Sequence, residues 1–167
     1  KRKPIPNEVL KIIQSQCQIY NDGPRWLVAL ISDTGMRLSE AAGLSKDDVC
    51  LDEGVHYVDI KPHPWRRLKT SGSQRKVPLA GTSLWAARQA YAASNSPFLF
   101  PRYCDEKECH SNSASAALNK WLKQVAGPDY GVYRCSDVRC LLDSVIPFRT
   151  GGRNDLTLYL SILCYPM

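Results

Sequence analysis

The feature that most constrains the fold is a run of six apolar residues, Trp26-Leu27-Val28-Ala29-Leu30-Ile31. Pro24 stands just before the run and suits the first turn of a helix, and Gly35 interrupts the segment after it. A helix that is apolar nearly all round is buried rather than placed on the surface. Spanning a bilayer takes about 20 such residues, so we expect a buried helix and no association with a membrane.

Most of the remaining chain has the sequence pattern of helices, and one part of it has the pattern of β-strands. Asn7 is expected to cap a helix that ends near Tyr20, and Ser45 to cap a single turn containing Asp47 and Asp48. Further helices are predicted at 39–42, from Thr82 or Ser83 to about Ala93, and from Ser113 to about Val125. Strands are predicted at 55–60 and 76–79, where β-branched and aromatic residues gather. The expected fold is mainly α with a small antiparallel sheet, in the α+β class.

Positive charge is concentrated in the middle of the chain. The formal net charge is +6. Residues 60–104 contain no Asp or Glu and eight basic residues: Lys61, Arg66, Arg67, Lys69, Arg75, Lys76, Arg88 and Arg102. A block without carboxylates has no acidic partner of its own and suits a polyanionic ligand.

The seven cysteines, at 17, 50, 104, 109, 135, 140 and 164, do not resemble a disulfide framework. Cys104 and Cys109 with His110, together with Cys135 and Cys140, are an alternative zinc-ligand set. Structural zinc more often uses two Cys-x2-Cys pairs. We therefore expect reduced thiols, no metal and a cytoplasmic protein.

The most informative segment is Thr34-Gly35-Met36-Arg37-Leu38-Ser39-Glu40-Ala41-Ala42-Gly43-Leu44. An arginine between a glycine break and a helix start can hold its guanidinium in a fixed place, as phosphate binding requires. Glu40 lies one turn later and could orient Arg37. The alternative is an ordinary surface ion pair, which contributes little to stability.

A second segment, Arg67-Leu68-Lys69-Thr70-Ser71-Gly72-Ser73-Gln74-Arg75-Lys76-Val77-Pro78-Leu79, reads as a basic hairpin. Lys69 at its tip could protonate a leaving 5′ oxygen or neutralise a phosphate. The residues expected to contact DNA are Arg66, Arg67, Arg75 and Lys76. For Arg66 and Arg67, the alternative is a basic surface that faces only solvent.

These two segments, followed by Phe98-Leu99-Phe100-Pro101, resemble the catalytic domain of the tyrosine recombinase (phage integrase) family over residues 7 to about 130. The resemblance implies attack of a tyrosine on DNA, a 3′-phosphotyrosyl intermediate and no cofactor. It also implies catalytic roles for Arg37, Glu40 and the hairpin Lys69.

The last part of the chain departs from the family pattern, which expects His-x-x-Arg, a Gly-His pair and then the nucleophile. Ser136-Asp137-Val138-Arg139 has the right shape without its histidine, and makes Arg139 the second catalytic arginine. Ile146-Pro147-Phe148-Arg149-Thr150 is a rival alignment. Tyr159 and Tyr165 are the candidate nucleophiles, and both come early.

The sequence thus predicts three parts: the end of an interdomain linker at 1–6, a recombinase-like core at 7–130 and an atypical segment at 131–167. The expected function is that of a site-specific recombinase fragment, truncated or frame-disrupted, which binds double-stranded DNA and in its full length self-associates there. By resemblance it is a DNA recombinase or integrase from a mobile element, but without a complete active site. One alternative is a catalytically inert DNA-binding remnant, and another is a small zinc-binding interaction domain.

Overall fold

The apolar run forms helix α2 (Gly23–Thr34) at the centre of a computed structural model that describes residues 5–52, 54–68 and 73–127. Asp22 caps this helix by accepting the backbone N–H of Arg25 at 3.1 Å. Gly35 ends it with a positive φ of 77°, a backbone conformation that glycine adopts without strain. All residues from Leu27 to Ser32 are buried, as predicted for a helix that is apolar on every side.

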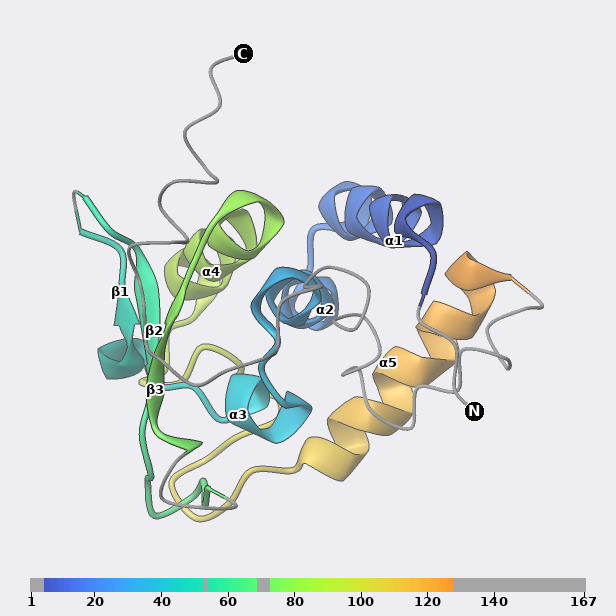
Figure 1. The fold of residues 1–167 in the computed structure, drawn as a ribbon. Coiled ribbons are helices and arrows are strands. Elements are labelled where there is room, and N and C mark those ends of the chain that lie inside the picture. The colour runs from blue at the N-terminus through green and yellow to red at the C-terminus, as the bar shows by residue number, and fades with distance from the viewer. Residues whose placement is uncertain (1–4, 53, 69–72, 128–167) are drawn as a thin grey trace.

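Four helices surround α2. They are α1 (Asn7–Tyr20), the short α3 (Leu38–Ala42), α4 (Gly81–Ala93) and α5 (Ser111–Ala126), and each contacts α2. Figure 1 shows α2 end-on, with α1 and α4 above it, α3 below it and α5 passing along one side. The core is therefore built around α2, and α3 is carried on its C-terminal end.

A small sheet covers the other side of the molecule. The 3₁₀ turn η1 (Lys46–Asp48) leads into β1 (Val49–Cys50), followed by β2 (Tyr57–Ile60) and β3 (Arg75–Pro78). The strands are antiparallel in the order β1-β2-β3, with Val58 paired to Val49 on one side and to Val77 on the other. Val58, Ile60 and Val77 are buried, so one face of the sheet joins the core.

The predicted α+β class, mainly helical with a small antiparallel sheet, is confirmed. Four helix starts differ from the predictions, and one of them is that of α3, which begins at Leu38 rather than at residue 39. Pro6 rather than Asn7 occupies the cap of α1, and α4 begins at Gly81 and α5 at Ser111, shortly before the predicted caps. At α4 the carboxylate of Asp33 accepts the N–H of Ser83 at 3.0 Å, so a residue of α2 does part of the capping. In the described part of the chain, no helix has the length and apolar character needed to cross a membrane.

Candidate functional site

The turn between α2 and α3 fixes the position of Arg37. The Arg37 backbone N–H donates to Oε2 of Glu40 at 2.8 Å. Glu40, the third residue of α3, thus caps the start of its own helix. Glu40 is buried, whereas about a third of the Arg37 side chain remains exposed, 33% by area. The predicted pairing of the two is present, with Arg37 Nη1 at 3.2 Å from Glu40 Oε1.

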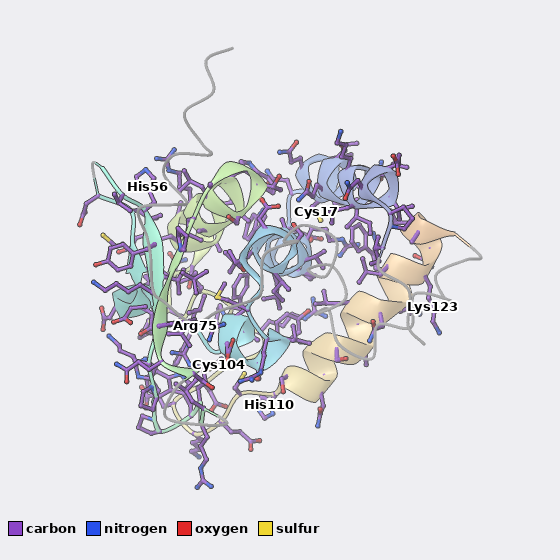
Figure 2. The ribbon with its side chains drawn as sticks, in the orientation of Figure 1. Cys17, His56, Arg75, Cys104, His110 and Lys123 are labelled. Carbon is purple, nitrogen blue, oxygen red and sulfur yellow. The ribbon has the colours of Figure 1, made fainter. Side chains whose placement is uncertain are left out.

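Glu40 also binds a second arginine, which comes from the sheet. Arg75 opens β3 and places its Nη2 at 3.0 Å from Oε2 of Glu40, while its Nη1 donates to the Ser73 carbonyl at 2.9 Å. Figure 2 shows Arg75 between β3 and α3. Like Arg37, Arg75 is about one-third exposed, 34% by area. One buried carboxylate thus holds two partly exposed guanidinium groups, which leaves a local excess of positive charge.

The surroundings of Glu40 keep it ionised. Burial acts to raise its pKa, but the hydrogen bonds from the Arg75 side chain and the Arg37 backbone outweigh this effect. The charges of both arginines act in the same direction, so the pKa of Glu40 lies below its ordinary value of 4.5. The carboxylate therefore stays charged at neutral pH and keeps both guanidinium groups in place.

This lowered pKa predicts a pH dependence of stability. A carboxyl whose pKa is lower in the folded than in the unfolded protein stabilises the fold above its unfolded pKa. That contribution is lost as the pH falls below the ordinary value of 4.5 and through the folded pKa. We expect the difference in free energy of unfolding between the wild type and Glu40→Gln, measured with urea, to shrink between neutral pH and about pH 3. Taking the difference between the two proteins cancels the contributions of the other carboxyl groups to the pH dependence. A difference in free energy of unfolding that stays constant with pH would contradict this prediction.

Other predicted catalytic residues lie outside the described part of the chain. These are Lys69, Arg139, Tyr159 and Tyr165. Of the segment around Lys69, the structure describes Leu68 before the tip and Ser73 after it. Ser73 contacts both arginines, because its hydroxyl lies 3.5 Å from Arg37 Nη1 and its carbonyl accepts from Arg75. The described fold therefore resumes at Ser73, beside Arg37 and Arg75.

Arg66 does not face solvent, so its predicted place on the DNA-contacting surface is wrong. It is 2% exposed. Its Nη1 donates to the carbonyls of Glu40 and Gly43, both at 3.1 Å, and its Nη2 donates to the Lys61 carbonyl at 2.7 Å. Arg66 thus binds the C-terminal end of α3 from within the protein, and its role is structural.

The buried partner of Arg66 is Asp48, in the turn η1. The Asp48 side chain is fully buried and lies 3.2 Å from Arg66 Nη2, 2.8 Å from His63 Nε2 and 3.5 Å from Lys61 Nζ. The sequence predicts Asp48 only as part of the turn that follows Ser45. The basic block has no carboxylate of its own, but Lys61, Arg66 and Arg75 are paired with Asp48 and Glu40, which come from earlier in the chain.

The two other residues predicted to contact DNA are accessible. Arg67 is exposed, next to the buried Arg66. Lys76 is also exposed, and its ammonium lies 4.5 Å from the centre of the Tyr57 ring on β2. Both are accessible to an anionic ligand at the surface, and they come before and after residues 69–72 in the chain.

The cysteines that suggested a zinc site are only partly described. Cys104 and Cys109 are paired across an isolated antiparallel bridge, while Cys135 and Cys140 lie outside the described residues. Within residues 5–52, 54–68 and 73–127, no group of three or more His, Cys, Asp or Glu side chains is arranged to hold a metal ion.

The comparison with protein families assigns the chain. Residues 6–134 match the model of the phage integrase family, the tyrosine recombinases. The match covers most of the chain, so this protein belongs to that family, as the ordered motifs predicted. Membership supports a recombinase-like role in DNA recombination and integration, and it makes DNA a plausible partner. Among curated proteins and solved structures, none matches this chain.

Proposed function

We propose that this chain binds double-stranded DNA as the core of a site-specific recombinase, in which Arg37 and Arg75 together bind one phosphate. The observation that carries the proposal is the pairing of both arginines with the buried Glu40. Guanidinium groups bind phosphate oxygens through parallel N–H donors, and groups held in place in advance lose little freedom on binding. About a third of each arginine side chain remains exposed to meet the ligand.

Two exposed cations carry further positive charge: Arg67 comes before residues 69–72, and Lys76 comes after them on β3. Because neighbouring residues of a strand point to opposite faces, Lys76 lies on the other face of β3 from Arg75 and would bind other phosphates of the duplex. Contacts of this kind position a protein on DNA without reading its sequence. We therefore expect binding that depends strongly on salt and little on base sequence.

In the full recombinase, we propose, the same two arginines stabilise the phosphate while a tyrosine attacks it. The 3′-phosphotyrosyl link conserves the energy of the broken bond, so rejoining needs no cofactor. Lys69 would protonate the leaving 5′ oxygen, and Arg139 would add a further donor. Self-association on DNA would bring together the protomers whose strands are exchanged.

Single substitutions of the two arginines test the proposal. Arg37→Ala and Arg75→Ala should each weaken duplex binding at least several-fold and lower the slope of log affinity against log salt by about 1. Each variant leaves Glu40 one arginine partner, so the fold should be retained. Fluorescence anisotropy of a labelled duplex across a salt series gives the affinities and slopes, and thermal unfolding checks the fold.

Arg88→Ala is the matched control, because Arg88 is an exposed arginine on α4 whose guanidinium meets His56 rather than Glu40. It should bind DNA nearly as the wild type does. If both site variants kept the affinity and salt slope of this control, the arginines would not contact phosphate and the proposal would fail.

A second candidate function is DNA binding without strand cleavage. It is favoured by one sequence fact: His110 is the last histidine of the chain, whereas the family pattern requires histidine beside its second arginine. Duplex binding does not separate the two candidates, because both bind DNA. A test for a covalent protein–DNA adduct does separate them.

A further inference from the structure

Two cysteines lie directly opposite each other in the segment that leads into α5. Cys104 and Cys109 are partners in an antiparallel bridge. The hydrogen bonds on either side run from His110 N–H to the Tyr103 carbonyl at 2.8 Å, and from Asp105 N–H to the Glu108 carbonyl at 3.1 Å. These two hydrogen bonds lie on either side of the cysteine pair and do not join the cysteines to each other. Cys104 and Cys109 are therefore a non-hydrogen-bonded antiparallel pair, in which the Cα atoms lie about 4.5 Å apart. A disulfide requires a Cα separation of about 4.4–6.8 Å.

The turn between the cysteines holds them in this register. The carboxylate of Asp105 accepts the backbone N–H groups of Lys107 and Glu108, at 2.8 and 2.9 Å. The turn is thus stabilised by its own side chain as well as by the two flanking backbone bonds. A bond between the two sulfurs would therefore need little movement of the backbone.

The two thiols differ in pKa and in accessibility, as is required when one thiol of a pair reacts first and the other follows. The neighbouring Cys104 thiol lowers the pKa of Cys109 against the opposing effect of burial, and the Arg66 guanidinium also lowers it. The neighbouring Cys109 thiol and burial raise the pKa of Cys104. Cys109, which is more accessible, is therefore the thiol suited to attack after losing its proton, and the buried Cys104 is suited to resolve the product.

We propose that Cys104 and Cys109 form a redox-active pair, which hydrogen peroxide oxidises to a disulfide and which two molecules of a small thiol reduce again, becoming a disulfide themselves. The Cys109 thiolate attacks one peroxide oxygen, the O–O bond breaks, and Cys109 sulfenic acid and hydroxide form. The Cys104 sulfur then attacks the Cys109 sulfur. The S–O bond breaks, and the departing oxygen leaves as water with the proton of Cys104. Two electrons pass from the sulfurs to the peroxide, which becomes two molecules of water with the protons of both thiols.

This pair also touches the element that carries Arg37 and Glu40. The Cys109 thiol lies 3.8 Å from the Ser39 carbonyl in α3, to which it donates. Figure 2 shows Cys104 beside α3 and His110 at the start of α5. Disulfide formation removes the donated hydrogen, so oxidation changes a contact of α3. The redox proposal itself does not depend on DNA binding, and the two can fail separately.

The cleavage sites of trypsin make the test direct. Cleavage after Arg102, Lys107 and Lys120 separates the two cysteines into peptides 103–107 and 108–120. The folded protein is treated with hydrogen peroxide, its remaining thiols are alkylated, and it is digested without reductant. Mass spectrometry should find these peptides joined, with two hydrogen atoms fewer than their sum, as the main disulfide product. A thiol reductant added before alkylation should remove the product.

Other cysteines supply the controls. Cys17 is buried, which raises its pKa to about 12, so it should stay a thiol in the same sample. Cys50→Ser should leave the joined peptides unchanged, while Cys104→Ser and Cys109→Ser should each abolish them. Failure to form the joined peptides in the folded wild type, or equal amounts of Cys109 joined to other cysteines, would overturn the proposal.

Discussion

Replacing Arg66 with methionine should lower the free energy of unfolding by about 3 kcal/mol, near the lower end of the effect of breaking a buried ion pair. The side chain is 2% exposed and its partner Asp48 is fully buried. Methionine keeps much of the volume of the arginine stem but supplies no donors. Asp48 then loses its most buried cation, and the carbonyls of Glu40, Gly43 and Lys61 lose the donors they bind. The effect stays near the lower end because His63 and Lys61 still face Asp48.

The neighbouring residue provides the control for this prediction. Arg67→Met makes the same chemical change at an exposed position, where most substitutions alter stability by at most about 0.5 kcal/mol. Urea unfolding of the two variants and the wild type under the same conditions gives the comparison. Equal stability of the two variants would show that the Asp48–Arg66 pair does not support the fold.

The sequence predicts the helices well because their signals are local. The apolar run, Pro24 and Gly35 all lie within or next to α2, and together they define its start, its burial and its end. The turn after Ser45 is also predicted, although the Ser45 hydroxyl does not cap it; instead the Asp48 carboxylate, three residues away, accepts the Ser45 N–H at 3.1 Å. The helix starts are less accurate because distant groups share in the capping, as Asp33 does for α4.

The candidate site is predicted only where its contacts are local. Arg37 and Glu40 are three residues apart, so their pairing follows from helix geometry. Arg75 meets the same carboxylate from 35 residues further along the chain, which requires β3 to lie beside α3. Nothing in the local sequence distinguishes the buried Arg66 from the exposed Arg67. Only the fold decides which of two adjacent arginines turns towards Asp48.

Membership in the recombinase family leaves open whether this chain cleaves DNA. Strand cleavage needs a nucleophile in line with the phosphate and the leaving oxygen. It also needs hydrogen-bond donors around the developing charge, and the loss of one donor commonly slows a reaction by about 10²–10³-fold. Under the function proposed above, Arg37 and Arg75 would act as such donors. The 57 residues after His110 contain no histidine.

We therefore expect the 167-residue chain to bind duplex DNA without forming a covalent adduct. The missing histidine would by itself leave a slow enzyme, because the other donors still act. A missing or displaced tyrosine would leave none, since no other side chain here is expected to form the phosphodiester link. The test uses a nicked suicide duplex, which traps the intermediate, at a concentration where anisotropy shows the DNA to be bound. Denaturing electrophoresis should then show only free DNA. A denaturation-resistant band that persists in Arg88→Ala but is lost in Tyr159→Phe or Tyr165→Phe would refute the prediction, and would identify the nucleophile.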